Sequence, residues 1–169
     1  MILVSVITLL VSLFLQGTLS NYLGYTYNNL SIFSTIYVLI ALLILNPYFE
    51  NKKKYFTLLI IFSLIIDIAY TNTLFLNTFL FIICYYISKI FHSIFPYNWL
   101  TVSVSNLICI TVYHVLTFLL LTILKYGVYS VTNLTKILSH SILMTIIYSI
   151  IVHVILSLIT KKFQLREVK

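Results

Sequence analysis

The stretch "YFTLLIIFSLIIDIAYTNTLFLNTFLFIICYYISKI" (residues 55–90) contains two long apolar runs separated by a short polar turn. Near-continuous apolar runs with few charges are typical of transmembrane helices, whereas the strands of a membrane barrel alternate apolar and polar residues. Asp67, the only aspartate in the chain, stands at the end of the first run. The stretch therefore predicts a helical hairpin in a membrane, with one carboxylate beside its turn.

The composition of the whole chain indicates the same class of protein. Of the 169 residues, 62% are hydrophobic and 8% are charged, and the mean hydropathy is +1.11. Soluble domains have roughly a quarter of charged residues, so a soluble fold could not hide this much apolar surface from water. We expect an all-α integral membrane protein in which residues 1–169 form a single transmembrane domain.

The apolar segments fit a bundle of six transmembrane helices. The first segment lacks the basic region and the cleavage site of a signal peptide, so we interpret it as a retained span. The third and fourth spans are short, which leaves a hairpin buried within the membrane as an alternative. A five-span arrangement also stays open, and it would place the two termini on opposite sides. The six expected spans are residues 2–19, 31–49, 55–71, 74–92, 99–124 and 139–160.

The basic residues predict the orientation. In a six-span chain whose termini share one side, eight of the ten basic residues fall on that side: Lys52, Lys53, Lys54, Lys89, Lys161, Lys162, Arg166 and Lys169. Cytoplasmic loops carry such an excess of Lys and Arg, so we expect both termini in the cytoplasm. The net charge of +7 then serves orientation and contact with membrane lipids, and we expect no nucleic-acid partner.

Polar residues form rows along three of the expected spans. Spacings of three and four keep each row on one side of its helix. In lipid such rows face other helices, so internal packing is the first interpretation, and a docking face or a substrate cavity is the alternative. The rows are Ser5, Thr8, Ser12 and Gln16; Thr101, Ser105, Cys109, Tyr113 and Thr117; and Ser141, Thr145, Ser149, His153 and Ser157.

Ionisable residues within spans are the candidates for chemistry, because they are costly to bury in a membrane. Asp67 and His114 lie at similar depths, about 20 and 22 Å from the cytoplasmic side, so we expect them to pair. His153 lies at another depth. The alternative for each histidine is a neutral imidazole bonded to a hydroxyl group.

The other chemistry-bearing residues do not suggest an enzyme. Only three acidic residues exist, the four histidines lie at different depths, and no hydrolase motif is present. We therefore expect no catalytic residue, no metal and no cofactor. Cys84 and Cys109 have no paired framework, and we interpret both as small apolar fillers.

Residues 63–90, "SLIIDIAYTNTLFLNTFLFIICYYISKI", resemble the MreD family of the bacterial rod-shape system. The resemblance rests on Ser63 to Asp67 at the end of an apolar helix, the turn Tyr70-Thr71-Asn72, and the step from Leu74 to Asn77 into the next helix. It implies a non-catalytic protein of the bacterial cytoplasmic membrane that binds MreC, a single-span protein. It also implies coupling of MreB filaments to RodA and a penicillin-binding transpeptidase.

The resemblance suggests a structural role for the hairpin. Asp67, followed by Tyr70, Thr71 and Asn72, is expected to accept hydrogen bonds from backbone N–H groups of the next turn and so to fix the hairpin. A direct contact with a partner is the alternative for Asp67. The candidate structural or partner-binding residues are Asp67, Tyr70, Thr71, Asn72, Asn77, His114, Ser149 and His153.

A second function stays open. The MreD fold is similar to the six-helix S components of ECF vitamin transporters, which bind a small molecule and dock on an energising subunit. Asn21, Asn28 and Asn29 in the first outer loop could line such a pocket. Ser5, Thr8 and Ser12 on the first span could provide the docking face.

Overall fold

A computed structural model describes residues 2–23, 35–71, 73, 75–125 and 130–162. The described residues form helices and no strand, so the predicted all-α class is confirmed for them. In chain order the helices are α1 (Ile2–Leu23), α2 (Tyr37–Leu45), the 3-10 turn η1 (Asn46–Tyr48), α3 (Lys52–Ile66), the π-helical turn η2 (Asp67–Thr71), α4 (Leu76–Ile94), α5 (Trp99–Ile123) and α6 (Val131–Lys162).

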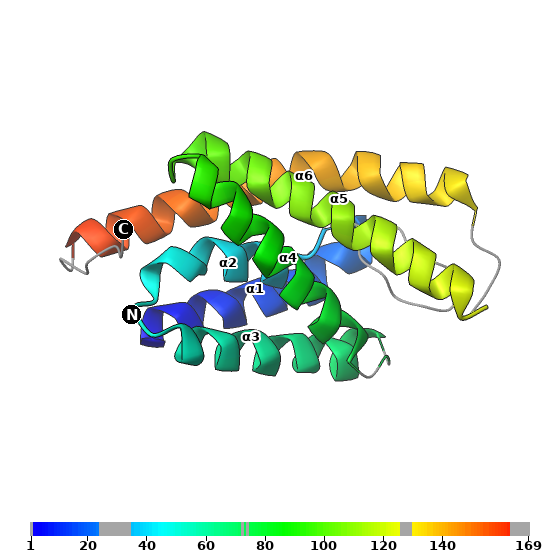
Figure 1. Ribbon diagram of the computed structural model, residues 1–169, viewed down its shortest axis with the longest axis horizontal. Helices are drawn as coiled ribbons and strands as arrows, with labels where there is room; N and C mark the ends of the chain where they lie inside the picture. The colour runs from blue at the N-terminus through cyan, green and yellow to red at the C-terminus, as the bar shows by residue number, and fades with distance from the viewer. Residues whose placement is uncertain (1, 24–34, 72, 74, 126–129, 163–169) are drawn as a thin grey trace.

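Successive helices run in opposite directions, so α1 begins and α6 ends at the same end of the molecule (Figure 1). We call this the basic end, and the opposite end the hairpin end, because the α3–α4 turn lies there. Helix α4 crosses the bundle obliquely, and it packs on both α3 and α5. Helix α6 packs along α5.

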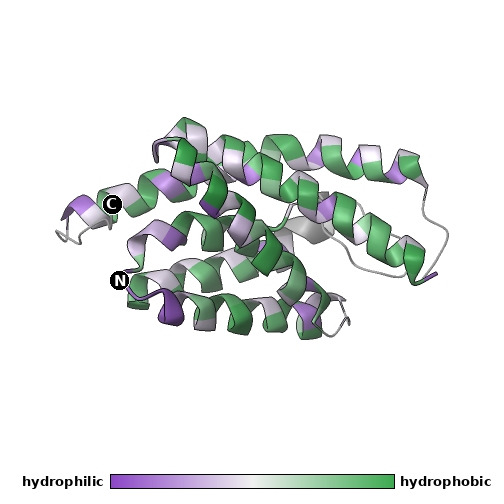
Figure 2. Cartoon of the chain, in the orientation of Figure 1, coloured by the Kyte–Doolittle hydropathy of each residue, from purple (hydrophilic) through white to green (hydrophobic). Residues whose placement is uncertain are grey.

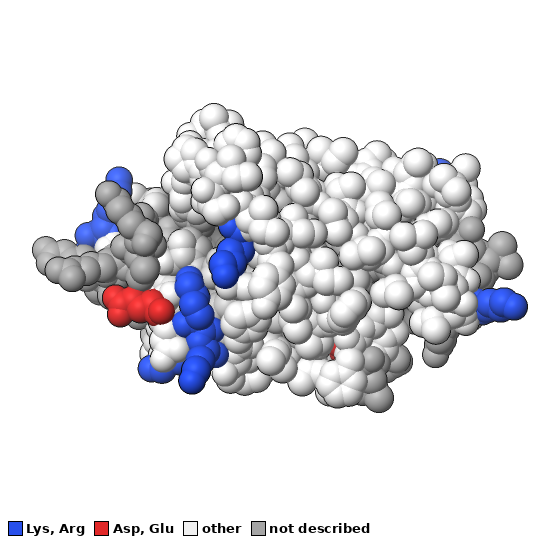
Figure 3. All heavy atoms as spheres, viewed as in Figure 1, with Lys and Arg blue, Asp and Glu red and all other residues white. Residues whose placement is uncertain are grey.

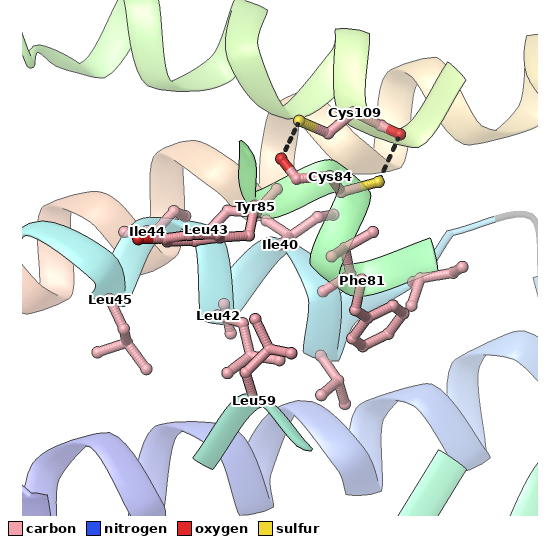
Figure 4. Packing of buried hydrophobic residues seen from close by; sticks show 14 of the residues in the cluster. Ile40, Leu42, Leu43, Ile44, Leu45, Leu59, Phe81, Cys84, Tyr85 and Cys109 are labelled. Atoms are coloured by element: carbon pink, nitrogen blue, oxygen red, sulfur yellow. Dashed lines mark hydrogen bonds between the residues drawn. The ribbon is translucent and has the colours of Figure 1, made fainter. Parts of the chain in front are cut away.

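Helix α2 forms the centre of the bundle. All nine of its residues are buried, and it contacts α1, α4, α5 and α6. Figure 4 shows Leu59 of α3 beside Leu42 of α2. It also shows Cys84 of α4 and Cys109 of α5, whose thiols each lie 3.4 Å from the other residue's carbonyl oxygen. Both cysteines are free and buried, as expected for small fillers.

Four helical segments are long and apolar enough to cross a membrane: Lys52–Thr71, Leu76–Ile94, Trp99–Ile123 and Val131–Lys162. Helix α2 with η1 is shorter, at about 18 Å for twelve residues, against a hydrocarbon core of about 30 Å. The expected span over 31–49 is therefore much shorter within the described residues, and its positions 31–34 lie outside them. These long apolar helices are compatible with a multi-pass membrane protein.

Helix α6 is longer than the sequence suggested. It has 32 residues and begins at Val131, whereas the expected span began at residue 139. Residues 131–138 include polar and basic side chains. The expected span followed hydropathy and therefore began where the apolar residues begin, although the helix itself begins earlier. The side chain of Ser130 accepts a hydrogen bond from the backbone N–H of Thr132, which starts the helix at that point.

Figure 2 shows hydrophilic residues where α3 begins and α6 ends, and also at the hairpin end. Figure 3 shows most of the visible Lys and Arg side chains gathered at the basic end, with fewer at the hairpin end. Lys125 and Lys136 flank the α5–α6 connection at the hairpin end. Six described lysines belong to the basic end: Lys52, Lys53, Lys54, Lys89, Lys161 and Lys162. The predicted separation of positive charge is therefore present in the fold.

Candidate functional site

The α3–α4 hairpin has two departures from regular backbone. At its end, α3 widens into the π-helical turn η2, which begins at Asp67. Phe75, directly before α4, has a left-handed backbone with φ 64°. Non-glycine residues rarely adopt this region, and π-helical turns are frequent at functional sites. The hairpin is therefore the natural place to look for a site.

Asp67 is the centre of this hairpin. Its side chain is fully buried, and its two carboxylate oxygens accept five hydrogen bonds. Oδ1 accepts from the Thr73 hydroxyl at 3.1 Å and from both the backbone N–H and the side-chain amide of Asn77 at 3.0 Å. Oδ2 accepts from the backbone N–H of Thr78 at 3.3 Å and from its hydroxyl at 3.2 Å. Every donor comes from the chain that follows the turn.

The backbone donors show that Asp67 caps α4. The first N–H groups of a helix have no partner within the helix, and a side-chain oxygen at the N-cap usually satisfies them. Phe75, the N-cap of α4, makes no such hydrogen bond. Asp67 of the preceding helix takes this part for Asn77 and Thr78. A carboxylate at a helix N-terminus also interacts favourably with the helix dipole.

Asn77 extends the network to a third helix. Its side-chain amide also donates to the Thr71 hydroxyl at 3.0 Å, and its side-chain oxygen accepts from the Tyr113 hydroxyl of α5. The Ser63 hydroxyl donates to that of Thr78 at 3.0 Å. We call this set the Asp67 network: Ser63, Asp67, Thr71, Thr73, Asn77, Thr78 and Tyr113. It holds α3, α4 and α5 together at the hairpin end.

A small cavity of about 10 Å³ borders the network. Its volume suffices for about one water molecule. Thr117, one turn beyond Tyr113 on α5, lies on the cavity wall. The full lining is Thr71, Thr73, Leu76, Asn77, Tyr113, Thr117 and Leu121.

In the Asp67 network, uncharged hydrogen-bond donors surround one carboxylate. The side-chain donors described for Asp67 are the hydroxyl groups of Thr73 and Thr78 and the amide of Asn77. Burying a charge is costly unless it is hydrogen-bonded, and five donors meet that requirement. No group of three His, Cys, Asp or Glu among the described residues could hold a metal ion.

Three of the candidate residues meet in this network: Asp67, Thr71 and Asn77. The expected hydrogen bonds from backbone N–H groups to Asp67 are present, on Asn77 and Thr78. Asn72 lies outside the described residues.

Tyr70 lies in the same turn but points to another helix. Its hydroxyl donates to the carbonyl oxygen of Leu13 in α1 at 3.1 Å. Gly17 makes room for this contact, since a Cβ added there would lie 2.8 Å from the Tyr70 hydroxyl. Tyr70 therefore ties the hairpin to α1.

The hydrogen bonds described for the Asp67 carboxylate do not include His114, and the expected pairing of these two residues stays a prediction. His114 is buried on α5 beside Tyr113, but the hydrogen bonds of Asp67 come from Thr73, Asn77 and Thr78. The expected pairing rested on equal depth, which does not fix the face of the helix that a residue occupies. Tyr113 occupies the face of α5 that contacts Asn77, and thereby meets the network.

Ser149 and His153 belong to other parts of the bundle. The Ser149 hydroxyl accepts from the side-chain amide of Asn106 on α5 at 2.9 Å. The His153 ring lies 5.4 Å from the ring of Tyr97 near the basic end. The candidate residues thus do not form one site.

Sequence reasoning did not assign Thr73, Thr78, Ser63 or Tyr113 to the site. Tyr113 carried a usable signal, because it belongs to a polar row at four-residue spacing. That row faces α4: Ser105 donates to Ser88 at 3.2 Å, and Tyr113 donates to Asn77. Most residues of the three rows are buried, which confirms internal packing as their main role.

Comparison with protein-family models, curated proteins and solved structures finds no match to this chain. Its function has therefore to be argued from its own residues.

Proposed function

We propose that the chain is a non-catalytic scaffold of the bacterial cytoplasmic membrane that acts as MreD proteins do. It crosses the membrane six times with both termini in the cytoplasm, and it binds an MreC-like single-span protein. Through that partner it supports side-wall peptidoglycan synthesis by RodA and a penicillin-binding transpeptidase.

This proposal rests on the hydrogen bonds and the burial of the Asp67 carboxylate. Its carboxylate lies in the segment that resembles the MreD family, and its five hydrogen bonds all go to the adjacent turn and helix. A carboxylate that transfers protons or binds a substrate needs access to water or ligand. Asp67 is fully buried and engaged with structural donors, which supports a role in fixing the shape of the hairpin.

The polar rows also favour a scaffold over a transporter component. The hydroxyls and amides that could form a substrate cavity are used between helices, as in the contacts of Asn106 with Ser149 and of Ser105 with Ser88. The cavity beside the Asp67 network is about 10 Å³, whereas small-molecule sites usually measure about 300–1,000 Å³. The space beside the Asp67 network is therefore too small for a vitamin.

A comparative pull-down tests this proposal. The tagged chain, its Asp67→Ala variant and a Thr57→Ala control are extracted from the native membrane in mild detergent, and captured proteins are identified by mass spectrometry. Thr57 is a matched control because it lies on α3 and its hydroxyl bonds only to the exposed carbonyl of Lys53.

The expected result is capture of an MreC-like single-span protein by the wild type and the Thr57→Ala variant, and reduced capture by Asp67→Ala. Capture of a membrane coupling subunit with two ATPases would replace the scaffold by a transporter component. Equal capture and equal accumulation of the wild type and both variants would contradict the role of Asp67.

A further inference from the structure

An apolar groove of about 430 Å³ runs between α1 and α6. Both helices pack on α2, and the hydroxyls of Ser12 and Tyr148 meet across the two helices at 2.7 Å. Apart from Thr8 and Tyr148 the wall is aliphatic. The lining residues on α1 are Val4, Ile7, Thr8, Val11 and Leu15, and those on α6 are Tyr148, Ile151, Val152, Ile155, Leu156 and Ile159.

The groove has the length of one membrane leaflet. It extends from Val4 to Leu15 on α1 and from Tyr148 to Ile159 on α6. At 1.5 Å per residue each wall is about 16 Å long, which is about half of a hydrocarbon core of about 30 Å. Because α1 begins and α6 ends at the basic end, the groove covers the leaflet at that end.

Positive charge lies where the groove ends. Lys161 and Lys162 are exposed and end α6, two and three residues after Ile159. Lys162 lies three residues beyond Ile159 and so continues the same face of the helix. Lysines in this position attract anionic headgroups.

We propose that this groove binds an anionic phospholipid of the leaflet at the basic end. One acyl chain lies between α1 and α6, and the phosphate group contacts Lys161 and Lys162. The inference requires insertion in a membrane but not the scaffold function.

A transmembrane helix of a partner fits the groove less well. Helix pairs in membranes approach through small residues, which are glycine, alanine, serine and threonine, and among the lining residues of the groove only Thr8 is of this kind. A spanning helix would also run the full thickness of the core, whereas the groove covers half of it. An acyl chain matches both the length and the aliphatic wall.

The test is native mass spectrometry of the full chain in detergent, with added phosphatidylglycerol or phosphatidylcholine of identical acyl chains. Removal of positive charge uses the Lys161→Gln/Lys162→Gln variant, and the Lys125→Gln/Lys136→Gln variant is its control at the hairpin end. Filling of the groove uses Ile155→Trp. The matched control is Ile147→Trp, because Ile147 is a similarly exposed isoleucine of α6 outside the groove. Circular dichroism confirms that each variant is folded.

For the wild type we expect about thirtyfold more bound phosphatidylglycerol than phosphatidylcholine, since two lysines contribute at the headgroup. The Lys161→Gln/Lys162→Gln variant should lose this preference, and Ile155→Trp should lose bound lipid of both kinds. Both control variants should behave as the wild type.

Equal binding of the two lipids by the wild type would overturn the proposal, as would retention of lipid by a folded Ile155→Trp variant. If Ile155→Trp instead released a single-span protein in the pull-down and left lipid binding unchanged, the groove would be a helix-docking site. Failure of the MreC-like capture alone would affect the scaffold proposal and leave the lipid proposal standing.

Discussion

Helices α3 and α5 begin in a different way from α2 and α4. Asn51 caps α3 and Asn98 caps α5, each with its own side chain and at the exposed basic end. Helices α2 and α4 begin at the hairpin end with apolar N-cap residues, Ile36 and Phe75, which make no side-chain cap. One N–H group in the first turn of α2 and two in that of α4 donate instead to side chains of other elements.

The two remote caps follow one pattern. Gln16 of α1 accepts a hydrogen bond from the backbone N–H of Val38 in α2 at 3.3 Å, and Asp67 of η2 accepts from the first turn of α4. Both capping side chains are fully buried. A buried N–H group without a partner is costly, and in these places a neighbouring helix supplies the oxygen.

Helix α6 shows that burial, and not the end of the molecule, decides the kind of cap. It begins at the hairpin end like α2 and α4, but its first turn is exposed and Ser130 caps it locally. A helix that starts at an exposed position is thus capped by residues adjacent in sequence. A buried start is encoded by a residue elsewhere in the chain, which joins two helices while it begins one.

The largest effect should follow removal of the Asp67 cap. Asp67→Ala leaves two backbone N–H groups and three side-chain donors without their acceptor, so we expect a loss of about 3–5 kcal/mol in the free energy of unfolding. Reversible unfolding in mixed detergent micelles would measure it.

Asp67→Asn is the matched control for this prediction. It keeps one oxygen acceptor at the same place but no charge, so its loss should be smaller than that of Asp67→Ala. Equal and small losses for both variants would mean that α4 does not depend on a remote cap.

The sequence shows only part of this arrangement. Apolar runs predicted the helical class, the separated positive charge and the hairpin, because these follow from composition and local order. The importance of Asp67 was evident because a lone carboxylate in an apolar run needs partners. Which partners it has depends on helix rotation, so Thr78 and Tyr113 were not assigned to it.

The central position of α2 was also not predictable from periodicity. Its nine residues are apolar on every side, and such a run is equally compatible with a lipid-exposed span and a buried core helix. Its short length follows from Asn46 and Pro47, which begin the 3-10 turn η1. The cap from Gln16 lies 22 residues away in sequence, beyond any local signal.

The local cap of α5 should contribute less to the free energy of unfolding than the remote cap of α4. Asn98 accepts from the backbone N–H of Thr101 at 2.9 Å, and the Thr101 hydroxyl accepts from the backbone N–H of Asn98 at 3.1 Å. Asn98→Ala should cost about 1 kcal/mol, because water replaces the lost acceptor at this exposed end. Asn98→Ser should restore most of the stability in the same unfolding assay. A loss as large as that of Asp67→Ala would remove the distinction between exposed and buried starts.

The left-handed backbone of Phe75 should give a smaller effect on the free energy of unfolding, and there glycine should be favoured over alanine. Its φ of 64° is strained for a residue with a side chain, and the ring is 64% exposed. Phe75→Gly and Phe75→Ala both remove the ring, so their difference isolates the backbone. The left-handed strain of Ala, about 1–2 kcal/mol, exceeds the entropy advantage of Ala over Gly in the unfolded chain, about 0.4–1 kcal/mol. We therefore expect Phe75→Gly to be more stable than Phe75→Ala by about 0.5–1 kcal/mol. The reverse order would show that the start of α4 adapts its backbone to the residue at the N-cap.

The smallest effect should come from the second remote cap. Gln16→Leu removes the acceptor of the Val38 N–H, but it also removes a buried side-chain amide nitrogen that has no hydrogen-bond partner among the described residues. The two changes oppose each other, since an unsatisfied buried donor costs about 1–3 kcal/mol wherever it lies. The net change in unfolding free energy should stay within about 0.5 kcal/mol, the typical range of a nearly neutral substitution. Amide hydrogen exchange separates the two terms, because the Val38 N–H should exchange faster in Gln16→Leu even where global stability is unchanged. Unchanged exchange at Val38 would show that α2 begins without help from α1, and the pattern of remote caps would then rest on Asp67 alone.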